Sequence, residues 1–491
     1  MMNRSKLKFL RAPEKFIKRF HPEEFDTKPY RTEFDRDRDR ILYSKAFRRL
    51  KGKTQVFWSG GSDYLRTRLT HTLEVSQIAR IIAYNLNLNG TLTEAIALGH
   101  DLGHTPFGHV GERTLNQIMN NCETVSDFQN SMEITDKGFK HNWQGLRVVV
   151  DLEKIYGRPG LNLTNFTLWG ILNHSNLCWS TCSNLKPRDQ KQVGNENNCY
   201  ILRNPKKCAQ KDHGKFGLSF YSMYEPYVQI ENNKNAWSFE GIIVGLADEI
   251  SQRHHDMEDA LYMGIIDTKE LIERVEGCLG EYIHRSRASG NIHRKLLKKL
   301  SELQQTVIFI PYLSKLVVDF YTNLLISNSI ENLRKFIDRY HITKREDFIA
   351  IYPDISEDDA KQVIAFPDDF QDKDREMQKF LKDRILNSYK AQQMDGKGRF
   401  IIRRLFKAYI TNPRQLQDTT IVSVFRTYNR EKIKEGDEYD KVKIGTLRDE
   451  IDSAENKSNA RFQISLLRTI CDFVAGMTDD YAFSIHEQLY G

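Results

Sequence analysis

A histidine-rich stretch set among helical apolar repeats is the feature that most limits how this chain can fold. Residues 66–112 contain four histidines, and the two runs around them keep apolar residues three or four positions apart. That spacing is typical of helices that bury one face. The first run begins at His71, and the second, residues 92–98, leads directly to the adjacent pair His100 and Asp101. The pattern predicts two packed helices that present His71 and this pair to one another. The apolar face of the first helix is predicted to contain Leu73, Val75, Ile78, Ala79, Ile82 and Leu86.

The adjacent residues His100 and Asp101 could supply two ligands of a metal site. One imidazole nitrogen and one carboxylate oxygen can bind the same divalent ion, with His71 as a third ligand. A fourth candidate lies in residues 239–256, where Asp248 follows apolar residues on a stretch that otherwise has the pattern of a core helix. Because burying an unpaired charge is costly, a carboxylate there needs a partner. We therefore predict one divalent ion held by His71, His100, Asp101 and Asp248, for which Mn, Fe, Co, Zn and Mg are all suitable.

Four sequence blocks together resemble one known family. The order of His71, the His100-Asp101 pair and Asp248 resembles the signature of the HD phosphohydrolase superfamily. HDLGHTPFGHVGE, residues 100–112, is similar to the motif of deoxyguanosinetriphosphate triphosphohydrolase-like proteins. The other three blocks are RDRDRILYSKAFRRLKGKTQVF (36–57), FKHNWQGLR (139–147) and DFVAGMTDDYA (472–482). The resemblance implies metal-dependent hydrolysis of a dNTP to a deoxynucleoside and tripolyphosphate, by water attack at the α-phosphorus, and leaves dGTP-specific and broad dNTP hydrolysis both open.

The expected fold is all-α. Helical periodicity runs through the core, and the resemblance implies the HD-domain helical fold with additional C-terminal helices. We expect an N-terminal arm at 1–35, an HD catalytic core at 36–267, and a helical region at 268–491 that completes the pocket and the oligomer contacts. A polar stretch at about 176–215 carries four of the seven cysteines and predicts an insertion. Its irregular cysteine spacing favours reduced thiols over structural zinc and leaves a zinc site open at Cys178, Cys182, Cys199 and Cys208.

The segment after the His100-Asp101 pair contains a candidate for proton transfer. His109 and Glu112 lie three positions apart on a predicted helix, so their side chains can meet. A histidine held by a carboxylate has a fixed tautomer and raised basicity, which proton transfer requires. The resemblance implies that this pair is the catalytic dyad, with His109 as either base or acid. It also implies a phosphate contact for His141, while His104 either supports the metal ligands or contacts a phosphate.

Further residues are predicted to contact the nucleotide. Arg68 lies three positions before His71 on one helix face, where a guanidinium suits a triphosphate; the alternative is a solvated surface arginine. The resemblance implies a phosphate role for Arg68, a sugar contact for Gln55 and a 3'-hydroxyl contact for Asp256. Position 252 departs from the family pattern, which often has a tyrosine where this chain has Gln252. The C-terminal residues predicted to complete the pocket are Arg404 and Tyr409.

Composition favours a soluble protein that binds an anion. Lys and Arg number 73 against 66 Asp and Glu, and the resulting net charge of +7 suits a nucleotide or a nucleic acid. No apolar run approaches the roughly 20 residues that span a bilayer. The N-terminus lacks the continuous apolar segment of a secretion signal, and the seven cysteines are an odd number. These features predict a cytoplasmic protein that does not associate with membranes.

Two alternatives to a dNTP triphosphohydrolase stay open. One is an HD-fold phosphohydrolase that acts on other nucleotides, and the other is a nucleotide-sensing, nucleic-acid-binding regulator. The pair of His109 and Glu112 argues against a pure sensor, because sensing needs no positioned acid or base. The resemblance also implies a homo-oligomer, often a hexamer. A second dNTP or single-stranded DNA as an effector, and additional Mg with the triphosphate, are further expectations.

Overall fold

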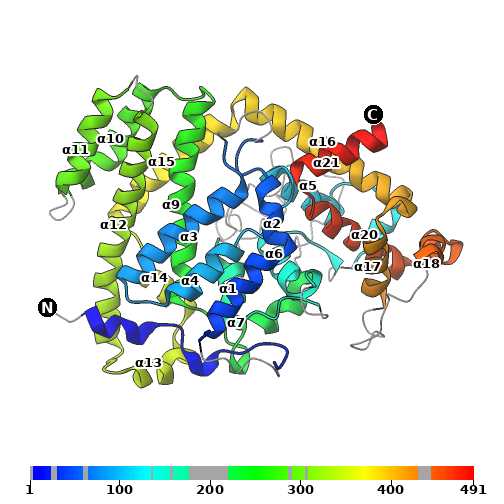
Figure 1. Ribbon diagram of the computed structural model, residues 1–491, viewed down its shortest axis with the longest axis horizontal. Helices are drawn as coiled ribbons and strands as arrows, with labels where there is room; N and C mark the ends of the chain where they lie inside the picture. The colour runs from blue at the N-terminus through cyan, green and yellow to red at the C-terminus, as the bar shows by residue number, and fades with distance from the viewer. Residues whose placement is uncertain are drawn as a thin grey trace, which may run out of the picture.

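The computed structural model describes nine segments of the 491-residue chain: residues 4–23, 30–58, 65–133, 136–154, 159–175, 219–285, 290–304, 308–429 and 444–491. Within these segments every regular element is a helix, and β-pairing is limited to isolated bridges (Figure 1). The all-α prediction is therefore confirmed. The predicted insertion and its four cysteines lie outside the described residues.

The N-terminal arm begins with a short helix that is packed against the fold. Residues Arg4–Leu10 form a 3-10 helix, and Leu7 and Leu10 are buried. The Arg345 guanidinium donates to the carbonyl oxygens of Phe9 and Arg11 at 2.6 Å each. These bonds fasten the arm to α13 (Arg345–Ile351).

Two helices share residues 33–49. Helix α1 (Glu33–Tyr43) begins after Thr32, and α2 (Lys45–Arg49) follows Ser44. Ser44 has extended backbone angles, and its hydroxyl accepts a hydrogen bond from the backbone N–H of Phe47. A serine that caps a new helix in this way ends the preceding one.

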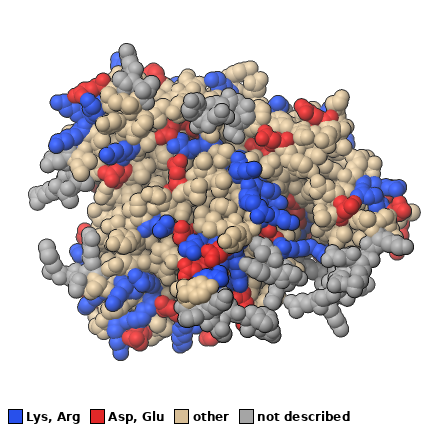
Figure 2. All heavy atoms as spheres, viewed as in Figure 1, with Lys and Arg blue, Asp and Glu red and all other residues tan. Residues whose placement is uncertain are grey.

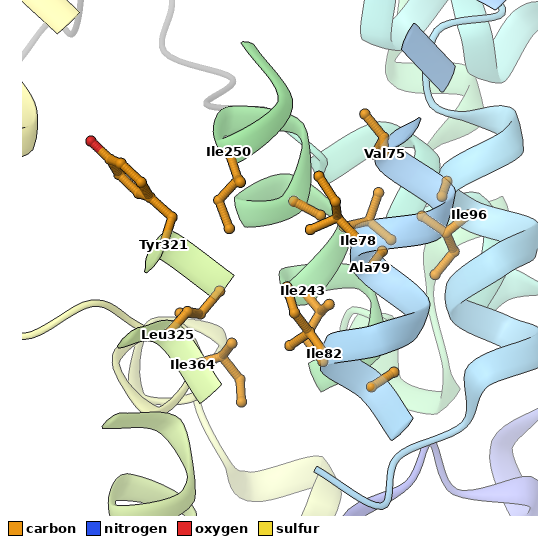
Figure 3. Close-up of a cluster of buried hydrophobic side chains, with 14 of the residues drawn as sticks. Val75, Ile78, Ala79, Ile82, Ile96, Ile243, Ile250, Tyr321, Leu325 and Ile364 are labelled. Carbon is orange, nitrogen blue, oxygen red and sulfur yellow. The ribbon is translucent and has the colours of Figure 1, made fainter. Parts of the chain in front are cut away.

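Three helices form the centre of the larger hydrophobic cluster. Helix α3 (Arg68–Asn85) packs against both α4 (Gly90–Gly99) and α9 (Phe239–Tyr262). Figure 3 shows Ile78 and Ile82 of α3 beside Ile243 of α9, with Ile96 of α4 on the other side of α3. The predicted apolar face of α3 is buried except at Leu73, which is 51% exposed. Helix α7 (Asn165–Asn173) packs against α4 and α9, and α6 (His141–Arg147) packs against α7.

Helix α12 (Phe309–Arg339) packs along α9 on the side away from α3. By length and composition it could cross a membrane, but 44% of its most apolar window is buried in the fold, and Leu313, Leu316 and Leu325 have no exposed surface. We assign α12 to the core on this basis. Around it lie α10 (Thr268–Arg285), α11 (Gly290–Glu302), α14 (Glu357–Val363) and α15 (Asp368–Leu386), the last of which begins within the charged segment 367–376.

A second, smaller hydrophobic cluster joins α5 (Gly108–Met119) to the C-terminal helices. Leu115 and Ile118 of α5 are buried there beside Ile402 and Leu466. In Figure 1, α5 lies among these helices, although nearly 300 residues separate it from them in sequence. The C-terminal helices are α16 (Tyr389–Thr411), α17 (Asp418–Tyr428), α18 (Ile444–Glu450), α19 (Ala454–Ser458), α20 (Ala460–Ala475) and α21 (Asp479–Tyr490).

The surface shows mixed charge. On the face drawn in Figure 2, Asp and Glu are interspersed with Lys and Arg, and one larger group of basic side chains lies near the centre. This distribution agrees with the modest net charge of +7. No strongly acidic or basic face is visible in this view.

Candidate metal centre and the adjoining α5 cluster

Four side chains from three elements meet at the junction of α3, α4 and α9. His71 lies in the first turn of α3, His100 and Asp101 follow the end of α4, and Asp248 lies near the middle of α9. His71 Nε2 is 2.9 Å from Asp248 Oδ1 and 4.0 Å from Asp101 Oδ2. His100 Nε2 is 3.4 Å from Asp101 Oδ1 and 3.9 Å from Asp248 Oδ1. We call His71, His100, Asp101 and Asp248 the metal cluster, because the structure brings together the four predicted ligands.

The histidines of the metal cluster present free nitrogens to the carboxylates. His100 Nδ1 donates to the carbonyl oxygen of Ala97 at 2.7 Å, so its Nε2 carries the lone pair in the neutral ring. His100 Nε2 is buried and has no hydrogen-bond partner among the described residues, and the buried Nε2 of His71 faces Asp248 Oδ1 at 2.9 Å outside good hydrogen-bond geometry. Buried imidazole nitrogens without a well-formed hydrogen bond are rare in folded proteins and call for an explanation such as a bound ion.

The distances within the metal cluster fit a single divalent ion. Ligands about 2.1 Å from an ion, separated by tetrahedral or octahedral angles, lie roughly 3 to 4 Å from one another. The four distances above, 2.9 to 4.0 Å, fall in this range. Burial alone would raise the pKa of Asp248, but the facing imidazoles of His71 and His100 hold it below the ordinary value. Two buried carboxylates beside two imidazoles are a suitable donor set for Mn, Fe, Co, Zn or Mg.

Two further predicted residues hold the carboxylates of the metal cluster. Arg68 is buried, and its Nη1 lies 2.7 Å from Asp101 Oδ2. Gln252 Nε2 lies 3.0 Å from both carboxylate oxygens of Asp248, one turn earlier on α9. Arg68 is thus no solvated surface arginine. Both side chains fix the orientation of a predicted metal ligand.

A second group of ionisable side chains surrounds the start of α5. Glu112 Oε2 accepts from His141 Nδ1 at 2.5 Å, and Glu112 Oε1 accepts from Lys140 Nζ at 2.9 Å. His109 Nδ1 lies 3.9 Å from Glu112 Oε2, and the His109 side chain is 69% exposed. The structure therefore pairs Glu112 with His141 and leaves the predicted partner His109 at the edge of contact. We call His104, His109, Glu112, Lys140 and His141 the α5 cluster.

His104 connects the α5 cluster to the metal cluster. Its Nε2 lies 3.1 Å from Asp101 Oδ1, and its ring stacks on that of His141 with centroids 3.9 Å apart. Burial lowers the pKa of His104 well below the ordinary value, with the Arg68 charge acting in the same direction. Burial also lowers the pKa of His141. For Glu112, burial would raise the pKa, but His141 and Lys140 bring it well below the ordinary value. At neutral pH the buried part of the cluster is thus an ionised carboxylate facing neutral imidazoles and one ammonium group.

The backbone between the two clusters is tightly constrained. A β-carbon at Gly103 would lie 2.0 Å from the carbonyl oxygen of His141, so only glycine allows this approach to α6. Phe107 precedes α5 with a left-handed φ of 60°. Its N–H donates at 2.9 Å to Asp479 Oδ1, and the other oxygen of Asp479 accepts from the Thr54 N–H at 2.8 Å. Asp479 of α21 therefore ties the turn before α5 to the segment that carries Gln55.

The remaining predicted residues lie at different distances from the centre. The β-carbon position of Gly108 is 3.7 Å from both Arg68 Nη2 and the carbonyl oxygen of Gln55, which puts Gln55 beside the α5 start. Asp256 is half-buried two turns after Asp248, and burial raises its pKa to about 7. Arg404 is exposed and contacts Phe400 and Tyr490, whereas Tyr409 is buried against Phe473. Within the described residues, no contact joins Arg404 or Tyr409 to either cluster.

The structure also adds residues that spacing alone did not identify. His174 caps α7, donates through Nδ1 to the carbonyl oxygen of Ile171 at 2.7 Å, and lies 5.1 Å from His100 between ring centroids. Burial lowers the pKa of His174 to about 3. His255 contacts His71, and Glu74 contacts His255. The available signals were a histidine ending an apolar helix, for His174, and a position seven residues after Asp248 on one helix face, for His255.

The comparisons with known proteins cover almost the whole chain. Residues 68–191 match the HD domain, and residues 364–432 and 445–488 match the phosphohydrolase-associated domain. The chain is similar to several proteins named deoxyguanosinetriphosphate triphosphohydrolase-like protein. The one from Leptospira interrogans serogroup Icterohaemorrhagiae serovar copenhageni is 31% identical over 468 residues, which cover 94% of this chain and 90% of the relative. Those from Rickettsia felis and Rickettsia bellii are 33% and 32% identical, and each alignment covers 94% of this chain and 92% of the relative.

Proposed function

Because the chain belongs to the deoxyguanosinetriphosphate triphosphohydrolase-like family of HD-domain hydrolases, we propose that it hydrolyses deoxynucleoside triphosphates to a deoxynucleoside and tripolyphosphate. The observation that carries the proposal is the metal cluster. Its two buried imidazole Nε2 atoms face two carboxylates at distances suited to one divalent ion. The names of the relatives supply the substrate class.

The proposed reaction transfers a phosphoryl group to water. The water oxygen bonds to the α-phosphorus, and the bond from that phosphorus to the sugar 5'-oxygen breaks. The water loses a proton and the 5'-oxygen gains one, so the three phosphates leave as one chain. When bound, a divalent ion supplies Lewis-acid polarisation of a phosphoryl oxygen. Additional Mg with the triphosphate remains part of the proposal.

Residues beside the metal cluster would bind the anionic part of the substrate. Arg68 contacts Asp101 with one nitrogen, Nη1, and its Nε has no hydrogen-bond partner in the described part of the chain. Lys140 contacts Glu112 Oε1, and its side chain is largely buried. A guanidinium beside the metal cluster and an ammonium group in the α5 cluster would stabilise the charge of a triphosphate.

Proton transfer is assigned to the α5 cluster. His109 has the only imidazole of this cluster that is mostly exposed, so it can reach a bound substrate. Glu112 lies 3.9 Å away, and such catalytic contacts are often longer before the substrate binds. His141, held by Glu112 and stacked on His104, would contact the phosphates. Gln55 and Asp256 are proposed to contact the sugar, and the cytoplasmic homo-oligomer stays a prediction.

The test is product identification with the full chain. The protein, loaded with Mn, Co or Mg, is incubated with each of the four dNTPs singly and in mixtures, and the products are separated by ion exchange. We expect a deoxynucleoside and tripolyphosphate in equal amounts, without phosphate or pyrophosphate. Activity in mixtures only would indicate an activating second nucleotide. No hydrolysis under any of these conditions, or release of pyrophosphate, would overturn the proposed reaction and favour another phosphoester.

A further inference from the structure

A line of hydrogen-bonded side chains runs from the metal cluster to the edge of the protein. His71 Nδ1 lies 3.2 Å from His255 Nδ1, on the ring edge opposite the metal cluster. His255 Nε2 in turn contacts Glu74 Oε2. His71 and His255 are each about 1% exposed, whereas the Glu74 side chain is 37% exposed. We call Glu74, His255 and His71 the histidine relay.

The proton count along the histidine relay is determined by the metal cluster. A neutral imidazole carries one N–H, so a His71 that binds an ion through Nε2 has its proton on Nδ1. That N–H donates to His255 Nδ1, which must then be the acceptor. The proton of His255 is therefore on Nε2 and is donated to the Glu74 carboxylate. Each contact of the histidine relay thus joins one hydrogen-bond donor to one acceptor.

The same count argues against a second ion at the outer end. Glu74, His254 and His255 place three possible ligand atoms within 4.8 Å of one another. If His255 Nε2 bound an ion, the His255 proton would move to Nδ1 and be donated to His71 Nδ1. His71 would then carry its own proton on Nε2 and could not bind the ion of the metal cluster. With neutral rings, the two ions exclude each other.

We propose that Glu74 and His255 are positioning residues that orient His71 and raise its affinity for the ion of the metal cluster. Metal-binding histidines commonly donate their second N–H to a carboxylate or carbonyl oxygen, and here His255 extends that arrangement by one ring. Arg66 Nε lies 3.2 Å from Glu74 Oε1 and holds the outer carboxylate in place. The inference rests on the proposed metal centre but does not depend on the identity of the substrate.

The test measures metal affinity in the full chain rather than turnover. Co²⁺ is titrated against a competing chelator, and the number of ions bound per chain is counted, for the parent protein and for His255→Phe and Glu74→Gln. Phe keeps a ring without hydrogen bonds, and Gln keeps an acceptor without charge. We expect one ion per chain and a Kd about 10- to 100-fold weaker in His255→Phe. Glu74→Gln should weaken binding in the same direction by less, and Glu74→Asp should restore part of the loss.

His254→Gln is the matched control. His254 neighbours His255 and its Nε2 lies 3.2 Å from Glu74 Oε2, but no described contact joins it to His71. The Kd of His254→Gln for Co²⁺ should equal that of the parent protein. Unchanged Kd values in both His255→Phe and Glu74→Gln would overturn the inference, as would two ions per chain with one lost in His254→Gln. If the parent protein binds no ion more tightly than Asp248→Ala does, the proposed metal centre itself fails.

A purely structural role gives a different result. Such a role would lower the thermal unfolding midpoint of His255→Phe without changing the cobalt absorption spectrum of the folded, loaded protein. The histidine relay predicts a changed spectrum, because the ring orientation of a ligand changes. An identical spectrum together with an unchanged Kd would therefore count against the relay even if the variant were less stable.

Discussion

The metal cluster and the α5 cluster lie side by side but differ in what holds them. All four residues of the metal cluster are at most 6% exposed, and they lie on or directly after helices of the larger hydrophobic cluster. In the α5 cluster, His109 and Glu112 lie on α5, a helix of the smaller hydrophobic cluster, whereas His141 begins α6, a helix of the larger one. The His109 side chain is 69% exposed. The metal ligands are thus built into one core. The reacting groups reach them through contacts between two cores.

The metal ligands are therefore preorganised, whereas His109 can adjust its position. Ligands on packed helices hold an ion without rearrangement, which supports affinity. A partly exposed histidine after a constrained turn can change its contact when a substrate enters. Lys53 Nζ donates to the carbonyl oxygens of His104 and Ala475, and Arg147 pairs with Asp472 at 2.6 Å. These bonds tie Lys53 and α6 to α20, a helix of the smaller hydrophobic cluster.

The largest effect is expected at the metal cluster. Asp248→Ala should lose the bound ion and all measurable hydrolysis, because two imidazoles and one carboxylate remain from a four-ligand set. Metal content after gel filtration and turnover with a dNTP mixture measure both. Glu249→Gln, which removes a charge from the next, exposed position of α9, should keep the ion. Full metal occupancy in Asp248→Ala would remove Asp248 from the ligand set and undo the contrast between the clusters.

In the α5 cluster, a loss of activity should occur without a loss of metal. His109→Ala should lower turnover by a factor on the order of 10² to 10⁴, which is the usual contribution of general acid-base catalysis. Glu112→Gln should lower turnover by a similar factor, because it removes the charge that faces both His109 and His141. Turnover and the cobalt Kd are measured on the same preparations. Weaker cobalt binding in His109→Ala would contradict the assignment of metal binding to the metal cluster and of proton transfer to the α5 cluster.

The helical fold and the composition of the metal cluster could be predicted because their signals are local. Apolar spacing of three and four positions defines α3 and α9, and the same spacing places Arg68 beside His71. Leu73 was the exception, since periodicity does not reveal which edge of an apolar face lacks a covering helix. Periodicity likewise does not reveal the boundary at Ser44, because its capping role depends on its own extended backbone angles.

The pairing within the α5 cluster could not be predicted in the same way. Spacing predicts that Glu112 meets His109, but Glu112 instead bonds to His141, 29 positions away, because Gly103 allows α6 to approach closely. Such a choice depends on tertiary packing. The same is true of Asp479, whose contacts with Thr54 and Phe107 span more than 370 positions of the sequence.

A smaller effect is expected where the two cores are tied together. Asp479→Asn replaces one acceptor oxygen by a donor, so either the Thr54 N–H or the Phe107 N–H loses its bond. An unsatisfied buried N–H costs about 1–3 kcal/mol, and we expect a decrease of that size in the free energy of unfolding. Turnover should fall roughly ten-fold while the cobalt Kd stays unchanged, because only the α5 side shifts. Denaturant unfolding and steady-state kinetics provide the two values.

The neighbouring Asp480 provides the control for Asp479→Asn. Asp480 is exposed and follows Asp479 in the first turn of α21, so Asp480→Asn removes the same charge near the same helix end without touching either bond. It should change neither stability nor turnover appreciably. Equal effects of the two substitutions would show that helix-end charge, rather than the tie to Thr54 and Phe107, is responsible.

The last prediction concerns stability alone and contrasts two buried carboxylates. Glu112 is fully paired in the α5 cluster, whereas Asp259 on α9 is 1% exposed and its Oδ1 has no hydrogen-bond partner in the described structure. Burial raises the pKa of Asp259 from 3.8 to about 7. The folded state therefore binds a proton that the unfolded state releases near pH 4. As pH rises from about 4 to 7, this group alone lowers the free energy of unfolding by about 1.4 kcal/mol per pH unit.

Asp259→Asn should remove this dependence, because an amide does not ionise. Compared with the parent protein, the variant should gain stability at pH 8 and less or none at pH 5, as measured by denaturant unfolding at both pH values. Asp383→Asn, at an exposed position of α15, should leave the pH dependence unchanged. If Asp259→Asn keeps the parent slope, Asp259 ionises without cost in the folded protein. The buried carboxylates of Asp259 and Glu112 would then be equally well stabilised. The exposure of His109 would be the only remaining difference in this comparison.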